Sequence, residues 1–259
     1  RPGDGKWDQS GNPSAIELQI SRIDFANMPA FGKSEPTMMN SYLAKAHLFK
    51  TDALYISKKA VVDDNFGAFS GEAFAANAWR NFPSLVGRGN VFAGDFITTL
   101  NDSAYIWGYG CGGGSYTSCG GVGTTTNLVT KNQKGIFTML FGSYFGDWDN
   151  QNNFLRAPLC CADPALTSGW AGRPNWFLHH MSLGENIGLG KLLTDNNLGL
   201  YTPYGYTTTG VHVALMGDLS LRAQYIKPAS NVRINGLASG ATIEWTASPD
   251  ASVLGYYVY

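Results

Sequence analysis

The fold class is decided by one stretch of the chain, Gly135-Ile-Phe-Thr-Met-Leu-Phe-Gly-Ser-Tyr-Phe-Gly-Asp-Trp-Asp149. A second stretch of the same form, Tyr105-Ile-Trp-Gly-Tyr-Gly110, precedes it. Each is a short apolar run that ends abruptly in glycines, which is typical of a parallel strand buried on both faces. In α/β folds, the loops at the carboxyl ends of such strands carry the binding or catalytic site. The two stretches therefore predict an α/β sheet with a site where these strands end.

Strands and helices alternate along residues 1–225, as in a sheet wound with right-handed crossovers. Ser34, followed by Glu35 and Pro36, predicts a helix start. We expect strands at 15–20, 53–57, 104–107, 136–141 and 211–216. We expect helices after Ser34 (burying Met39, Tyr42, Leu43, Ala46 and Phe49), from Gly71 to about Asn81 after a Ser70 cap (burying Phe74, Ala75, Ala78 and Trp79), at 154–159 and within 181–197.

The sequence changes character after residue 225, so we divide the chain into 1–225 and 226–259. Strand alternation replaces helical periodicity from Ala229 onward. Trp245, Ser248-Pro-Asp250 and Gly255-Tyr-Tyr-Val-Tyr259 resemble the opening strands of a fibronectin type III domain. The resemblance implies a partial all-β sandwich, and an uncovered half sandwich is not stable in water. We therefore expect that the polypeptide continues, or that another chain or the α/β domain covers the inward positions Val232, Ile243, Trp245 and Val258.

Composition excludes several classes of partner. The formal net charge is −1 and no basic run is present, so nucleic acid and anionic membrane surfaces are not expected as partners. A membrane-spanning helix needs about 18 to 20 consecutive apolar residues, and no segment of the sequence approaches this length. Residues 1–5 are polar and turn-like, so they do not predict a signal peptide. Only 14% of residues are charged, against about 25% in typical soluble proteins. This polar, charge-poor composition favours an extracellular or cell-surface protein.

Three segments together resemble the gingipain-type, caspase-like cysteine peptidases. Tyr105–Gly110 matches the histidine loop of that family, and 143–149 matches its cysteine loop. The segment 214–222 matches the closing strand and its Gly-Asp turn, after which that family commonly carries a fibronectin- or immunoglobulin-like module. The resemblance implies a three-layer α/β/α domain with a mostly parallel sheet. Tyr109 then stands in the place of the histidine, and Ser143 in the place of the cysteine.

This substitution removes the chemistry of the family. A cysteine peptidase needs a thiolate paired with an imidazole, and neither tyrosine nor serine is usefully ionised at neutral pH. We therefore expect no peptidase activity. The alternative is a hydrolase with a displaced nucleophile, either Ser143 or Cys111. For Cys111 the candidate bases are His179, His180 and His212. The expected binding crevice consists of Trp107, Tyr109, Gly110, Ser143, Asp147 and Trp148.

Other constellations leave alternatives open. Cys111 and Cys119 flank a Gly-rich loop, so either a disulfide between them or free buried thiols is expected. Asp147 and Asp149 precede several amide side chains, which suggests either a Ca²⁺ site or a polar turn before a helix. The Gly-rich segment 110–123 lacks a phosphate-loop pattern and is expected to be a flexible loop. No other cofactor is implied. Further aromatic residues are expected either to line a sugar or peptide cleft or to pack in the core: Trp148, Trp170, Trp176, Tyr201, Tyr204 and Tyr206.

The sequence thus predicts an exported, non-catalytic protein with a pseudo-peptidase domain. Its role is either binding, with a protein or glycan partner in an extracellular assembly and self-association as a further alternative, or purely structural.

Overall fold

The computed structural model describes residues 14–170, 176–196, 213–223, 229–237, 239–251, 253, 255 and 256. The chain forms two compact units, Arg1–Ala223 and Gln224–Tyr259. The predicted strand at 211–216 and the fibronectin-like stretch at 255–259 lie partly outside the described residues. Tyr201, Tyr204, Tyr206, His212 and Val258 lie entirely outside them.

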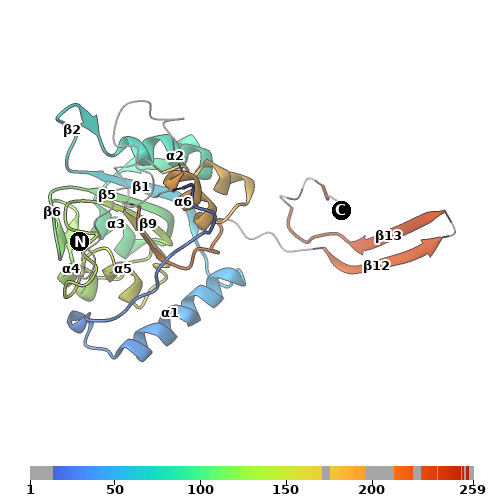
Figure 1. Ribbon diagram of the computed structural model, residues 1–259, viewed down its shortest axis with the longest axis horizontal. Helices are drawn as coiled ribbons and strands as arrows, with labels where there is room; N and C mark the ends of the chain where they lie inside the picture. Colours follow the sequence, from blue (N-terminus) through green and yellow to red (C-terminus); the bar gives the residue numbers. More distant parts are fainter. Residues whose placement is uncertain are drawn as a thin grey trace. The chain divides into compact units, whose positions relative to one another are not determined.

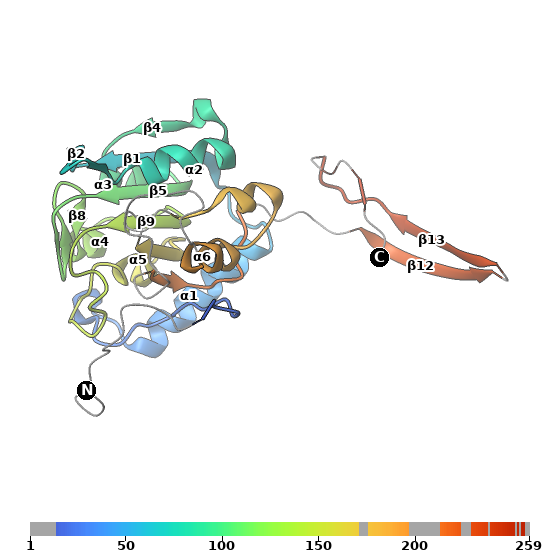
Figure 2. The same cartoon turned by 45° about the horizontal axis from the view of Figure 1, so that its top comes forward.

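A six-stranded sheet forms the centre of the first unit (Figures 1 and 2). All of its strands run parallel except the strand at one edge, which runs antiparallel to its neighbour. The prediction of a mixed, mostly parallel α/β sheet is therefore confirmed. In spatial order the strands are β11 (Leu215–Gly217), β10 (Thr167–Trp170), β9 (Phe137–Phe141), β5 (Tyr105–Cys111), β1 (Ser57–Asp64) and β4 (Val91–Ala93).

Helices cover both faces of this sheet (Figure 2). One face carries α2 (Ala76–Val86), η3 (His179–Leu183) and α6 (Ile187–Asp195), which contact one another in sequence. The other face carries α3 (Phe96–Asp102), α4 (Thr125–Thr130) and α5 (Ala157–Cys160), with α1 (Glu35–Lys50) packed against α5. Because the connection after β1 leads to α2 while those after β4 and β5 lead to the opposite face, β1 and its neighbours form a topological switch point. Such switch points are where open α/β sheets bind ligands.

The first helix begins where the sequence predicts. The Ser34 hydroxyl accepts a hydrogen bond from the N–H of Thr37 and caps α1. Its buried face differs from the prediction, because Leu43 is 54% exposed while Lys45 is buried. The Lys45 ammonium donates to the carbonyl oxygens of Leu159 and Cys161 at the end of α5. That contact fixes the rotation of α1 and turns Leu43 outward.

Two predicted strands are wrong. Residues 15–20 form no strand, because the side chain of Asn196 bonds both the N–H and the carbonyl of Ile16 in place of a strand partner. Residues 53–57 precede the actual strand β1, which begins only at Ser57. Its buried centre is Ala60-Val61-Val62, and charged residues at both ends conceal it in the sequence.

The helix predicted from Gly71 starts at Ala76 instead. Residues 68–73 form a hairpin of β2 (Ala68–Phe69) and β3 (Glu72–Ala73), with Ser70 and Gly71 at positive φ of 49° and 80° in its turn. Phe74, Ala75 and Ala78 are buried as predicted, but Trp79 is exposed. The helices predicted at 154–159 and within 181–197 correspond to the shorter helices α5 and α6. The Gly-rich segment after β5 is not an irregular loop, because it contains a small sheet of β6 (Gly114–Ser115), β7 (Ser118–Cys119) and β8 (Gly123–Thr124).

The second unit contains a two-stranded antiparallel sheet of β12 (Ser230–Leu237) and β13 (Gly240–Thr246). Ile234 pairs with Ile243 on one face, and Arg233 pairs with Glu244 on the other. The Trp245 ring contacts the ring of Tyr256 at 5.3 Å between centroids. Val232, Ile234 and Trp245 are exposed. This hairpin is thus amphipathic, with an apolar face that the described residues of the second unit leave uncovered.

Candidate functional site

The loops that follow β5 and β9 meet at the carboxyl edge of the sheet. The two strands are parallel neighbours, with Cys111 level with Phe141. Immediately beyond them, Gly114 lies so close to the chain of the β9 loop that a Cβ there would overlap the backbone N and O of Ser143. This contact requires glycine at position 114, and it joins the two loops into one surface.

Tyr109 lies inside β5 and not in the loop where we expected it. Its ring is fully buried, and its hydroxyl donates to the carbonyl of Phe74 at 2.8 Å. Burial raises the pKa of its hydroxyl well above the usual value. The flanking positions 108 and 110 require glycine, because the face of the sheet that carries α3 leaves no room there for a side chain. A Cβ at Gly108 would lie 2.6 Å from Leu100 Cδ1, and one at Gly110 would lie 2.6 Å from Val122 Cγ1.

The other expected crevice residues divide into two groups. Trp107 and Gly110 are buried, and Trp107 packs between Phe82 and Phe137 with ring centroids 5.3 and 4.6 Å away. Ser143 and Asp147 are exposed on the β9 loop, and Trp148 is half-buried. Within the described ranges no hydrogen bond links Ser143 to an imidazole. The expected crevice is therefore not a single surface, since only its β9-loop residues face solvent.

Cys111 ends β5 as a buried, free thiol. Its Sγ donates to Asp64 Oδ1 at 3.2 Å. Burial, followed by the hydrogen bond to this carboxylate, raises the pKa of Cys111 to about 12. Cys119 Sγ bonds a different acceptor, the carbonyl of Phe141, at 3.5 Å. Cys111 and Cys119 are therefore free buried thiols and do not form a disulfide with each other. A nucleophilic cysteine must be a thiolate, and the surroundings of Cys111 disfavour that form.

An aromatic cluster lies over the carboxyl end of β9. Phe74 and Phe141 are 4.4 Å apart between ring centroids, and Phe66 contacts both at 5.0 and 6.0 Å. Trp170 continues the cluster at 6.2 Å from Phe141 and donates its indole N–H to the Gly142 carbonyl. Trp176 is buried and donates to the Trp170 carbonyl. The two tryptophans therefore pack the start of the β9 loop. The sequence does not single out Phe66, which lies in the bend between β1 and β2 and reaches this cluster only in the folded chain.

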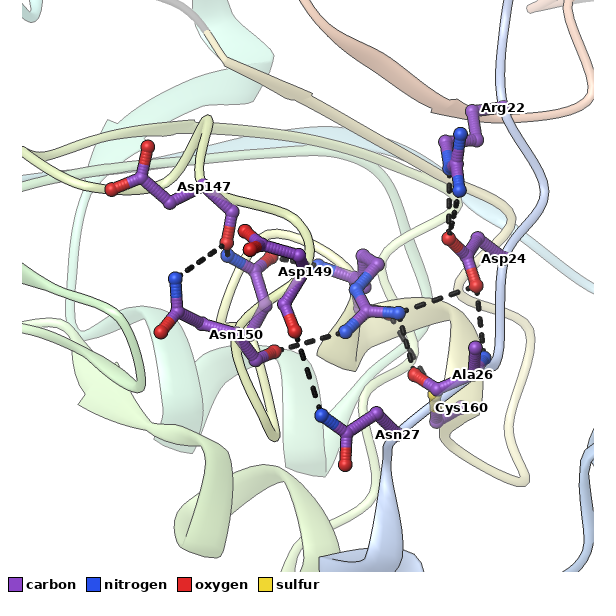
Figure 3. A network of polar contacts seen from close by, with 10 residues as sticks. Arg22, Asp24, Ala26, Asn27, Asp147, Asp149, Asn150 and Cys160 are labelled. Carbon is purple, nitrogen blue, oxygen red and sulfur yellow. Dashed lines mark hydrogen bonds and ion pairs between the residues drawn. The ribbon is translucent and has the colours of Figure 1, made fainter. Parts of the chain in front are cut away.

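The rest of the β9 loop is fastened by a buried arginine. Arg156 donates to the carbonyls of Ala26 and Asn150 at 2.6 and 3.0 Å and pairs with Asp24 at 3.3 Å. Asp24 also pairs with the exposed Arg22 at 2.7 Å (Figure 3). Burial acts to raise the pKa of Asp24, but the N–H of Ala26 and the two guanidinium groups outweigh it, so the pKa is lowered. The loop is thus anchored to the N-terminal strap, residues 14–31.

The arrangement of this loop does not favour the Ca²⁺ alternative. Asp147 and Asp149 take part in the network through their backbone carbonyls, which accept from Asn150 and Asn27 (Figure 3). The Asp147 carboxylate points away from Asp24 and Arg22 (Figure 3). No group of three or more His, Cys, Asp or Glu side chains in the described part of the chain is placed to hold a metal ion. The polar-turn alternative describes this segment better.

A cavity of about 490 Å³ opens beside the β5 loop, on the face that carries α3. Its size falls within the range of small-molecule sites. Hydroxyl, amide and carboxylate groups line much of it, together with the apolar side chains of Ile97 and Val122. The lining also includes Asp95, Thr98, Ser118, Thr124, Asn127 and the backbone of 119–123. The sequence does not reveal this cavity, because the caps of α3 and α4 come together only once the chain is folded.

Two exposed tyrosines stand where the loops meet. Tyr116, between β6 and β7, and Tyr144, after β9, have ring centroids 5.2 Å apart and ring planes at 63°. They are 42% and 56% exposed. Tyr144 has a φ of 68°, a backbone conformation that bulky residues seldom adopt.

Comparison of the chain with protein-family models, curated proteins and solved structures finds no match. Among the helices that the structure describes, none is long and apolar enough to cross a bilayer.

Proposed function

We propose that the α/β unit is a non-catalytic binding domain of an exported or cell-surface protein, built on a degenerate peptidase site of the caspase-like, gingipain type. The mixed, mostly parallel six-stranded sheet is compatible with that architecture. The meeting of the β5 and β9 loops supports it further, since the resemblance assigns the paired catalytic groups to these loops. The fibronectin type III-like segment belongs to the same proposal as the first strands of an appended module.

The state of Tyr109 is the observation that carries the non-catalytic assignment. The position matched to the catalytic histidine is occupied by a buried ring whose hydroxyl is bonded to the Phe74 carbonyl. A general base must reach the proton that it abstracts, and this buried hydroxyl is bonded to a backbone carbonyl and does not ionise near neutral pH. Ser143 is exposed but lacks a bonded base among the described residues. Cys111 is buried, and its pKa of about 12 keeps it protonated.

The test is a search for hydrolysis with the full chain. Labelled casein and a library of fluorogenic tetrapeptides are incubated with the wild type and with the Cys111→Ser and Ser143→Ala variants. We expect no turnover above buffer in any of the three. Hydrolysis that disappears in either variant would establish the displaced-nucleophile alternative and overturn the proposal.

The cellular location is tested separately. A membrane-impermeant biotin reagent, applied to intact cells of the natural host, should label the exposed lysines of this protein. Labelling that appears only after lysis would contradict the export proposal.

A further inference from the structure

The Tyr116–Tyr144 pair has the form of a binding platform. The two rings come from loops that follow different strands, yet they meet edge to face with centroids 5.2 Å apart. Both rings remain substantially exposed. Exposed tyrosines give a large contact area at low entropic cost, with a flat apolar face and a polar tip.

The backbone beneath the two rings is fixed. Gly114 packs directly on the Ser143 backbone, and the Tyr116 carbonyl accepts from the N–H of Phe154 at 2.7 Å. The Tyr144 carbonyl accepts from the N–H of Asp147 at 3.2 Å, and the next residue, Phe145, is fully buried. A platform held in this way loses little freedom when a ligand binds, and preorganisation of this kind increases affinity.

The backbone at Tyr144 indicates that its side chain does not serve stability. Its φ of 68° suits glycine or asparagine far better than an aromatic residue. The ring also buries little surface that would compensate for the strain, because more than half of it is exposed. Residues held in unfavourable backbone regions cluster at functional sites. We therefore infer that this ring is present for contact with a ligand.

The surroundings of the rings indicate the class of ligand. Thr117, Ser143, Gly146 and Asp147 beside them are exposed and polar or small, and Asp147 forms no ion pair within the described residues. Two isolated rings with a polar rim are too small for a stable protein interface, which buries about 1,200 to 2,000 Å² in total. They match a pyranose ring, whose C–H face packs on an aromatic ring while its hydroxyls bond carboxylate and hydroxyl groups.

We propose that Tyr116 and Tyr144 form a binding platform for neutral pyranose oligosaccharides. This inference rests on the proposed function, because it names the ligand class of the non-catalytic carboxyl edge. Tyr116 and Tyr144 supply the packing faces, and Ser143 and Asp147 supply hydrogen-bond partners at the rim.

The experiment compares the wild type with four variants. Full chains are applied to a printed array of neutral hexose and N-acetylhexosamine oligosaccharides, and the strongest ligand is then titrated by calorimetry. Tyr144→Gly and Tyr116→Ser should each weaken binding at least tenfold. Tyr55→Ser is the matched control, because Tyr55 is 92% exposed and belongs to neither loop, and it should leave the affinity unchanged. Because glycine suits a φ of 68°, Tyr144→Gly should unfold at the same temperature as the wild type or higher, so its loss of binding cannot be ascribed to unfolding.

Several outcomes would overturn the platform. These are no binding to any oligosaccharide on the array, affinity that both tyrosine variants retain, or binding lost only in Thr98→Trp, which fills the separate cavity beside α3. Tyrosine variants that change the sedimentation coefficient but not sugar binding would show a self-association surface instead. Chromatography of the titrated oligosaccharide separates the two proposals. Shortened products would contradict the non-catalytic function, whereas absent binding without cleavage contradicts the platform alone.

Discussion

Arg156 should be among the most sensitive polar residues of the α/β unit. The substitution Arg156→Leu removes a buried side chain. Its guanidinium group bonds the carbonyls of Ala26 and Asn150 and pairs with the Asp24 carboxylate, so it joins the N-terminal strap to the β9 loop. Arg22→Leu is its matched control, because Arg22 pairs with the same Asp24 carboxylate but has a side chain that is 55% exposed. The two variants therefore test how far burial determines the contribution of an ion pair.

The magnitudes follow from the contacts. Removing one partner of a buried ion pair costs about 3 to 5 kcal/mol, and the lower end applies because Asp24 keeps Arg22. The hydrogen bonds to the carbonyls of Ala26 and Asn150 are included in this loss, at about 1 kcal/mol each. We expect Arg156→Leu to lower the free energy of unfolding by about 3 kcal/mol. Arg22→Leu should lower it by about 1 kcal/mol or less, as for other exposed pairs.

Urea unfolding at neutral pH, followed by far-ultraviolet circular dichroism, measures both values. A pH series adds an independent check. The pKa of Asp24 is lowered in the folded state, so its stabilisation is present above its unfolded pKa of about 3.9 and is lost as the pH falls through the lower folded value. The difference between wild type and Arg156→Leu should therefore narrow in strong acid. Equal losses in the two variants, or a loss below about 1 kcal/mol for Arg156→Leu, would refute the reasoning.

Three further predictions concern packing and buried ionisable groups. Gly114→Ala should destabilise the protein by about 1 to 3 kcal/mol in urea, since its Cβ overlaps the Ser143 backbone; an unchanged midpoint would contradict this contact. Burial raises the pKa of Asp195 to about 6 although it pairs with the buried Lys191 at 2.6 Å. Asp195→Leu alone should therefore destabilise by leaving an unpaired ammonium, while Lys191→Met with Asp195→Leu should restore wild-type stability or exceed it; a double variant as unstable as the single one would argue against this. The four buried thiols all have raised pKa values, so the stability they contribute is present below about pH 8.5 and is lost at higher pH. The melting temperature should fall above that pH, and a four-alanine variant that falls as steeply would disprove the cause.

The sequence determines the centre of this fold better than its periphery. The apolar runs of β5 and β9 identified two neighbouring parallel strands, because strands buried on both faces carry little else. Strand β1 was missed because its apolar centre is only Ala60-Val61-Val62 between charged ends. Ser70 has the chemistry of a helix cap, but it occupies a hairpin turn at positive φ. Local patterns could not distinguish these cases, since tertiary contacts decide them.

The candidate site shows the same division. The sequence placed the β5 and β9 loops at one edge, but it could not place the end of β5. Gly108 and Gly110 are typical of a strand terminus, yet they pair within the strand, and they are glycines because Leu100 and Val122 occupy the space that side chains would need. Tyr109 consequently belongs to the core, whereas Tyr116 and Tyr144 are exposed at this edge. Their proximity depends on the contact of Gly114 with Ser143, which no linear pattern encodes.

The N-terminal strap has a consequence for the order in which this protein is assembled. Arg22 bonds the backbone of Leu215 and Gly217 at 3.0 and 2.8 Å, so this contact closes a loop of almost the entire α/β unit. Contacts between residues so distant in the chain are slow to form. During synthesis, the strap emerges from the ribosome before the strands of the sheet, but β11 follows only nearly two hundred residues later. The strap is therefore attached to the edge of the sheet only after β11 has been made.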